Sequence, residues 1–288
     1  MEKTVQLKKT ASKRKAKRVL DYVIIVIIGV VLLYPIIWMF FASFKTNEEI
    51  FGSVALLPKS FSMTYFVEGW SSGTMTYSQF FLNTAFLVLP TVFLTVCSCG
   101  LVAYGFARFR FPCKKLLFSL LIATLMLPNA VIIIPRYALY NQFGWVNTYL
   151  PFYVPAMLGC YPFFVFMLVQ FMRGLPKDLD ESAYIDGCGT FRVLVQILLP
   201  LLKPALFSAG LFQFMWTYND YFNSLIFINS VSKYPVSLAL RLSMDSESVI
   251  IWGKLMAMSF VVVLPLIILF FAAQKYFVEG IATTGMKG

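Results

Sequence analysis

Histidine is absent from the 288 residues of this chain. Its absence excludes histidine-ligated metal sites, Ser-His-Asp triads and histidine general bases. No C-x-x-C spacing occurs either, and we interpret the cysteines as small apolar packing residues, not metal ligands or disulfide partners. They are Cys97, Cys99, Cys113, Cys160 and Cys188. The chain is therefore expected to hold no metal and to be no enzyme.

Charged residues are also scarce. They make up 13% of the chain, compared with about 25% in a soluble domain, while hydrophobic residues make up 59%. So few charges cannot cover the surface of an ordinary globular protein. The surplus of apolar surface indicates a protein that is surrounded by lipid.

Six apolar stretches are long enough to cross a membrane, which takes about 20 residues of helix. Runs of this length and continuity are helices, because backbone polar groups must be satisfied within the segment in lipid. The sequence therefore predicts an all-α, polytopic membrane protein with six transmembrane helices. The predicted spans are about 22–44, 80–106, 116–135, 149–172, 204–228 and 255–273, with a short helix near 47–51 in the first external loop.

Positive charges predict the orientation of these spans. Eight of the 24 Lys and Arg residues lie in a basic tail at residues 1–21, and 18 of the 24 fall on the same side of the predicted membrane as this tail. Positive charge marks the cytoplasmic face, so both termini are expected in the cytoplasm. Topology and anionic lipid headgroups thus account for the net charge of +11, and no nucleic-acid partner is expected.

The cytoplasmic loop at 174–203, between spans four and five, is the most informative segment. Pro176 and the acidic residues after it favour a helix start, and Gly187 and Gly189 favour its end. We expect a short amphipathic helix with its acids on one side and its apolar residues on the other. The apolar residues are Leu179, Ala183 and Tyr184. A helix of this kind can dock in a groove of a soluble partner.

Seven residues of this loop share a longer spacing: Glu181, Ser182, Ala183, Gly187, Ile197, Leu199 and Pro200. They match the pattern E-A-A-x3-G-x9-I-x-L-P, and the loop therefore resembles the signature loop of ATP-binding-cassette importer permeases. The one departure is Ser182, which replaces the first Ala of the pattern with another small residue. The resemblance assigns these residues, together with Asp186, to a coupling helix and loop on which the ATPase docks.

The resemblance extends along the chain and is strongest to the carbohydrate-uptake branch of the maltose-transporter type. The stretches that match are Ser43–Thr46, Ala103–Phe109, Met126–Pro128, Asn219–Asp220 and Phe277–Gly280. Tyr218 departs from the pattern, because this branch usually has Trp before Asn-Asp. The basic tail at 1–21 would then precede a permease domain at 22–288.

The resemblance also implies partners. They are a second, related permease, two ATPase subunits that bind ATP and Mg, and an extracellular solute-binding protein that delivers a carbohydrate, in a bacterial plasma membrane. The chain itself has no G-x4-G-K-[ST] phosphate loop, so it is not expected to bind ATP in that way or to carry a cofactor.

Asp220 is an acidic residue within the fifth predicted span. A charge in mid-membrane is costly, so it normally faces a cavity or a partner. At about 100° per residue, the same helix face carries amides and an indole, which suit the hydroxyls and the ring face of a sugar. We assign a substrate pathway to Gln213, Trp216, Asn219, Asp220 and Asn223. The alternative is that Asp220 serves helix packing or gating.

Other functions remain open at this point. A polyamine permease of the same fold would favour a more acidic pathway, and a sugar-phosphate permease would need Arg or Lys within a span, where none is expected. A secondary transporter would usually show more spans and paired broken helices in two halves. A membrane enzyme is disfavoured because no clustered carboxylates line the spans.

Overall fold

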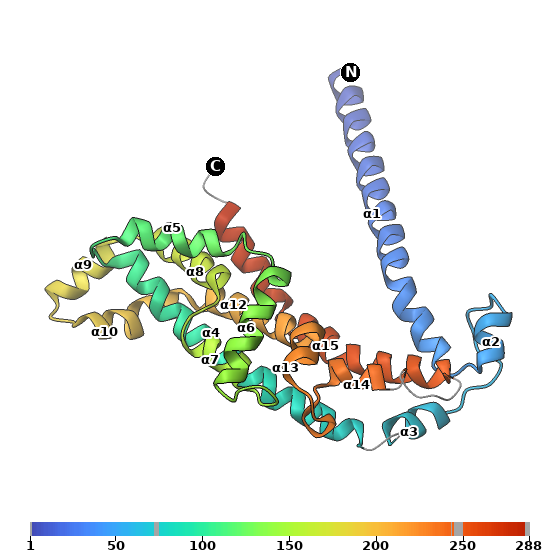
Figure 1. Cartoon of the computed structure of the whole chain (residues 1–288). Helices are drawn as coiled ribbons and strands as arrows, with labels where there is room; N and C mark the ends of the chain where they lie inside the picture. Colours follow the sequence, from blue (N-terminus) through green and yellow to red (C-terminus); the bar gives the residue numbers. More distant parts are fainter. Residues whose placement is uncertain (1, 72–74, 243, 245–249, 286–288) are drawn as a thin grey trace. The chain divides into compact units, whose positions relative to one another are not determined.

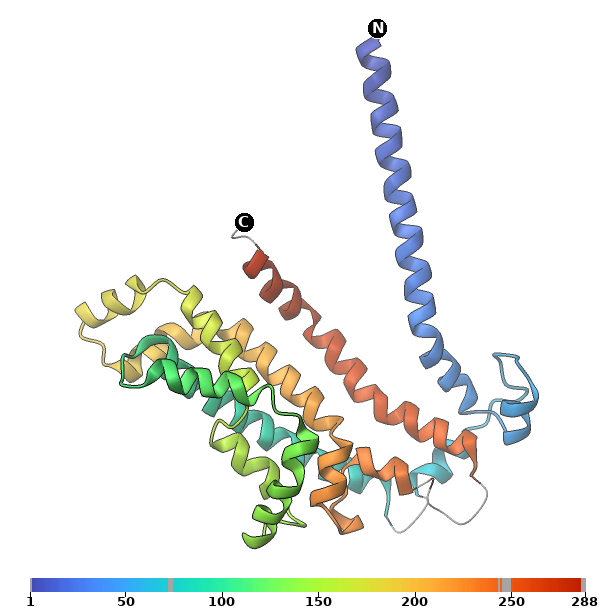
Figure 2. The same cartoon turned by 45° about the horizontal axis from the view of Figure 1, so that its top comes forward.

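The computed structural model describes residues 2–71, 75–242, 244 and 250–285, and the side chains within 18–71, 75–242, 244 and 250–274. Every regular element in these described ranges is a helix. The chain divides into two compact units, Met1–Trp70 with Ser246–Val261, and Ser71–Asp245 with Val262–Gly288. Figures 1 and 2 show the helices from two directions.

The first unit contains three helices and the start of the last one. They are α1 (Glu2–Ala42), α2 (Asn47–Gly52), α3 (Thr64–Trp70) and α15 (Trp252–Gly285). The helix α1 includes the basic tail, and the apolar side chains of its part from Val19 to Leu33 are exposed. Exposed apolar side chains all around a helix are typical of a helix that contacts lipid.

Asn47 fixes the first turn of α15 within this unit. Its Nδ2 donates to the Ile250 carbonyl at 2.7 Å, and its Oδ1 accepts from the Trp252 amide at 2.9 Å. Gly253 lies so close to the Lys45 carbonyl that an added Cβ would clash with that oxygen. The backbone of the segment after α1 therefore packs directly on α15 at a position that only glycine can occupy.

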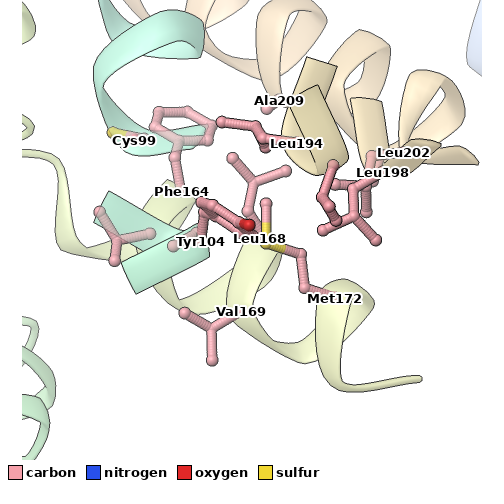
Figure 3. Close-up of a cluster of buried hydrophobic side chains, with 14 of the residues drawn as sticks. Cys99, Tyr104, Phe164, Leu168, Val169, Met172, Leu194, Leu198, Leu202 and Ala209 are labelled. Carbon is pink, nitrogen blue, oxygen red and sulfur yellow. The ribbon is translucent and has the colours of Figure 1, made fainter. Parts of the chain in front are cut away.

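The second unit is built around α4 (Tyr77–Arg108), a helix of 32 residues. It packs against α7 (Leu150–Met157), α8 (Pro162–Gly174) and α12 (Lys203–Tyr218). The side chains labelled in Figure 3 converge from α4, α8 and α12 and from the segment before α12 on one buried cluster. Its members include Cys99, Tyr104, Phe164, Leu168, Val169, Met172, Leu194, Leu198, Leu202 and Ala209.

At its other end, α4 holds the segment that follows α13 (Tyr221–Phe227), which includes the short helices η2 (Val231–Lys233) and α14 (Val236–Leu242). The Asn83 amide donates to the Ser232 and Tyr234 carbonyls at 2.9 and 3.0 Å. The Thr84 hydroxyl accepts from the Val236 amide at 2.8 Å. These bonds fix the segment to the start of α4.

Within the part of the chain that the structure describes, four helical segments are long and apolar enough to cross a membrane: Arg18–Ala42, Tyr77–Arg108, Leu150–Gly174 and Trp252–Gln274. Two further pairs of helices qualify only if each bent pair is one span, which gives up to six. The first pair is α5 (Lys114–Thr124) with α6 (Asn129–Gln142), bent by 103°, and the second is Thr190–Leu201 with Lys203–Tyr218, bent by 77°.

The third span was expected to run continuously over 116–135, and the structure differs. The helix α5 ends at Thr124 and α6 begins after Pro128. The residue before a proline avoids the helical region, which favours a break here. Since α6 continues beyond Pro135 to Gln142, Arg136 lies inside a helix of the bent pair. The prediction of one continuous helix over 116–135 is therefore wrong, and Arg136, which follows the predicted span, lies within the second helix of the pair.

The fifth span was expected to run over 204–228, but α12 ends at Tyr218. Asp220 is the N-cap of the separate helix α13, and its Oδ1 accepts from the Asn223 amide at 3.1 Å. A short polar side chain that caps a new helix competes with continuation of the old one. The residues of the predicted pathway therefore do not lie along one continuous helix.

Candidate functional site

The loop at 174–203 forms a short helix, α9 (Asp178–Ile185), followed by α10 (Thr190–Arg192). Both lie at the end of the unit where α4 also ends (Figures 1 and 2). Gly187 has a φ of +79°, and the next amide, that of Cys188, donates to the Ala183 carbonyl at 2.9 Å. An added Cβ at Gly187 would meet nothing within 4 Å, so its left-handed backbone, not crowding, is what requires glycine.

The two sides of α9 differ from the expectation. Ala183 is buried as expected, but Asp180 is only 8% exposed, whereas Leu179 is 37% and Tyr184 45% exposed. The prediction that all acids face away from the apolar side is therefore wrong. An acid can be buried here because a basic residue from another helix lies against it.

That basic residue is Arg108, the last residue of α4. Its Nε lies 2.7 Å from Asp180 Oδ2, and its two terminal nitrogens donate to the Leu175 carbonyl at 3.4 and 3.3 Å. The Nε–H is not aimed well enough for a hydrogen bond to the carboxylate, so this link is an ion pair. One turn earlier, the Tyr104 hydroxyl donates to the Thr190 carbonyl at 3.0 Å. The last turn of α4 thus holds both sides of the loop.

The second half of the loop carries the I-x-L-P residues. Val193–Leu198 form a π-helical turn, η1, and the Leu199 amide donates to the Leu194 carbonyl. Ile197 and Leu199 are partly buried against the central cluster, whereas Pro200 is exposed and lies in α11 (Leu199–Leu201). A proline lacks the amide that an α-helix would use, so a wider turn before it and a bend after it are favoured.

The outward side of the loop combines apolar and acidic side chains. Ile185 is 87% exposed and Phe191 73% exposed. With the exposed residues Asp178, Leu179, Glu181, Tyr184 and Asp186 they form what we call the loop surface. Sequence reasoning missed Ile185 and Phe191, although large apolar residues beside acids in a short loop are a detectable signal. The Ser182 hydroxyl is used within α9, where it donates to the Asp178 carbonyl at 2.7 Å.

A second polar group of residues surrounds Asp220. The side-chain nitrogen Nδ2 of Asn223 donates to both Asp220 carboxylate oxygens, at 2.9 and 2.8 Å. The side-chain oxygen Oδ1 of Asn223 accepts from Arg136 Nη2 at 2.5 Å. Arg136 also donates to Asn129 Oδ1 at 3.0 Å, and its guanidinium lies 5.4 Å from the centre of the Phe227 ring. Asn223 therefore bridges an acid and a base, and the group as a whole is electrically neutral.

The other predicted pathway residues do not join this group. Gln213 is buried and donates to the Thr217 hydroxyl at 2.8 Å. Trp216 is 48% exposed and its ring packs at 5.0 Å on both Phe163 and Phe164. The side-chain nitrogen Nδ2 of Asn219 donates to the Met215 carbonyl at 2.8 Å, at the end of α12. The structure thus brings Asp220 and Asn223 together and adds Arg136, which sequence reasoning had placed outside the spans.

Comparison with known proteins gives consistent results. Residues 97–283 match the family described as "Binding-protein-dependent transport system inner membrane component". The chain is 33% identical over 255 residues to the probable ABC transporter permease protein YurM of Bacillus subtilis, covering 88% of this chain and 84% of that protein. It is 30% identical to the trehalose/maltose transport system permease protein MalG of Thermococcus litoralis, covering 94% and 98%.

Two further matches cover almost the whole chain. The arabinooligosaccharides transport system permease protein AraQ of Halalkalibacterium halodurans is 28% identical, over 96% of this chain and 100% of that protein. The crystal structure of a bacterial ABC transporter that imports the acidic polysaccharide alginate includes a chain that superimposes with a TM-score of 0.78 at 19% identity, over 90% and 95% of the two chains. This last likeness concerns the fold.

The capping role of Asp220 can be tested by stability. We expect Asp220→Ala to lower the free energy of unfolding by about 1 kcal/mol, because it removes the oxygen that accepts from the Asn223 amide. Asp220→Asn keeps an acceptor oxygen and should stay closer to the wild type, so it serves as the matched control. Thermal unfolding of the detergent-solubilised chain measures both. Equal losses in the two variants would show that the cap contributes nothing.

Proposed function

The chain belongs to the family of inner-membrane components of binding-protein-dependent transport systems, and we propose that it forms half of an oligosaccharide pathway in a bacterial plasma membrane. It is a multi-pass permease subunit of an ATP-binding-cassette importer. The observation that carries the proposal furthest is the loop surface, which exposes apolar and acidic side chains at one end of a helical unit.

The loop surface is the proposed docking site for the ATPase subunits. Apolar side chains as exposed as those of Ile185 and Phe191 are costly in water and suit a hydrophobic pocket on a partner. The flanking acids Glu181 and Asp186 are exposed and can meet basic residues at the rim of such a pocket. ATP and Mg would be bound by those subunits, and a second related permease and an extracellular solute-binding protein would complete the importer.

An oligosaccharide is the proposed substrate. The related permeases named above serve trehalose and maltose in one case and arabinooligosaccharides in another. The neutral group of Asp220, Asn223 and Arg136 offers both donors and acceptors, which hydroxyl groups need. Trp216 exposes an indole on which a sugar ring can stack. With Gln213 and Asn219 these residues remain our proposed pathway.

A sugar phosphate is the second candidate, because Arg136 lies within the bent pair of helices. Its guanidinium is already engaged by Asn129 and Asn223, and Asp220 lies on the far side of the Asn223 amide. A phosphate would have to displace these partners and approach a carboxylate. The neutral sugar is therefore preferred.

Uptake measurements test the substrate. The gene for this chain is deleted from the chromosome, and the wild-type chain or a variant is expressed in its place. The cells are then offered labelled maltose, trehalose, arabinotriose, glucose 1-phosphate and spermidine in turn. We expect uptake of one or more of the sugars, and a decrease of several-fold in Asp220→Asn, which keeps the shape but removes a charged acceptor. Uptake of spermidine or glucose 1-phosphate alone would contradict the sugar assignment.

Docking is tested by pull-down of the ATPase subunit that co-purifies with the wild-type chain. Ile185→Asp and Glu181→Lys should each reduce its recovery about ten-fold or more, because they place a charge in an apolar contact or reverse an acid at its rim. Gly187→Val should do the same by straining the end of α9 at its φ of +79°. Lys115→Glu, an exposed charge reversal in the first turn of α5, is the control and should leave recovery unchanged. Wild-type recovery in all three variants would refute the docking assignment.

The topology is tested with reporters fused after Gly288. With both termini in the cytoplasm, a reporter that is active only in the cytoplasm should be active there, and one that requires export should be silent. The opposite pattern would contradict the proposed orientation of the spans.

A further inference from the structure

We propose that α4 is the element that transmits movement of the cytoplasmic loop to the segment 230–242, with Arg108, Asp180 and Tyr104 as the positioning residues that join it to the loop. This inference rests on the proposed docking of the ATPase at the loop surface. It goes further because it names the route by which a displacement of α9 reaches the other end of the unit.

The link at the loop end is buried and two-sided. The side chains of Arg108 and Asp180 are only 7% and 12% exposed, so their ion pair is poorly screened by water and salt. Arg108 additionally holds the Leu175 carbonyl before α9, while Tyr104 holds the Thr190 carbonyl after it. A displacement of α9 in any direction therefore acts on the last turn of α4.

At its other end, α4 is joined to the segment after α13. Asn83 and Thr84 bind backbone groups of Ser232, Tyr234 and Val236. The two sets of contacts are separated by 20 residues, from Thr84 to Tyr104, to 25 residues, from Asn83 to Arg108, which correspond to about 30 to 38 Å of helix. Pro90 lies inside this length, but the helix continues through it.

The covalent routes from the loop are less suited to carry movement. Before α9, the chain leaves α8 through Leu175 in an extended conformation. After α10, it passes through the π-helical turn η1 and then through a bend of 77° before α12. Breaks of this kind absorb rotation, whereas a continuous helix transmits it. The route through α4 is therefore the stiffest connection between the loop and the segment 230–242 that the described residues provide.

The test must separate this role from simple stabilisation of the fold. Removing one member of a buried ion pair leaves an uncompensated charge, whereas replacing both by neutral groups can be nearly neutral for stability. The variants are Arg108→Gln, Asp180→Asn, the double variant that combines them, and Tyr104→Phe, which removes only a hydroxyl. Arg110→Gln is the matched control, because Arg110 is exposed and lies two residues beyond Arg108.

Each variant is purified as the whole importer and reconstituted in liposomes with its solute-binding protein. Three quantities are measured: recovery of the ATPase subunit, ATP hydrolysis, and uptake of the sugar that the wild-type chain carries in the panel above. We expect the double variant and Tyr104→Phe to retain the ATPase subunit. The double variant should move roughly ten-fold less sugar per ATP hydrolysed than the wild type, which is the change expected when a bond to a charged group is lost. Tyr104→Phe should move several-fold less sugar per ATP hydrolysed than the wild type, and Arg110→Gln should move as much as the wild type.

Two results would overturn the inference. One is a double variant that assembles and moves as much sugar per ATP as the wild type, which would make the ion pair purely structural. The other is an equal loss in Arg110→Gln, which would make the effect non-specific. If instead Ile185→Asp keeps the ATPase subunit bound, the proposed docking site fails on its own measurement, independently of the sugar-to-ATP ratio.

Discussion

Close approach of α4, α8 and α12 is the interaction on which the second unit depends. Lipid chains are as apolar as leucine, so helices in a membrane gain little from hiding apolar surface and associate through close packing. The facing positions on α4 and α12 are accordingly small. Cys99, Ala103, Ala205 and Ala209 are at most 1% exposed, and Gly210 lies against Val96. The larger side chains of α8, such as Phe164 and Met172, complete the cluster.

Three charged residues of this unit, Arg108, Asp180 and Asp220, lie where helices begin, end or break. Arg108 is the last residue of α4, and its partner Asp180 lies in the first turn of α9. Asp220 lies between α12 and α13, where it caps the second of them. At such positions a charged side chain can satisfy free backbone groups as well as a partner charge, which lowers the cost of burying it. The Arg108–Asp180 pair thus lies at the end of α4, and Asp220 lies at the break between α12 and α13.

The bends in the chain follow from prolines and have a role in this arrangement. Pro128 precedes α6, and Pro200 and Pro204 flank the bend between the loop and α12. The I-x-L-P residues therefore do more than mark a family. Ile197 and Leu199 anchor the loop on the cluster while Pro200 ends the regular helix. The bends interrupt the covalent paths around α4, and α4 is left as the continuous helix between the loop and the segment 230–242.

Much of this protein was determined by sequence alone. Apolar runs located the helices Tyr77–Arg108 and Trp252–Gln274 to within a few residues, because hydrophobic length is a local property. The spacing from Glu181 to Pro200 identified the family, and the left-handed backbone at Gly187 agrees with the helix end expected there. The tertiary structure decided what depends on residues distant in sequence. The partner of Asp180 is 72 positions earlier, and the partner of Asn223 is 87 positions earlier. Because a charge is buried or exposed according to what folding brings against it, no local pattern could tell that Asp180 faces inward or that Arg136 meets the Asp220 group.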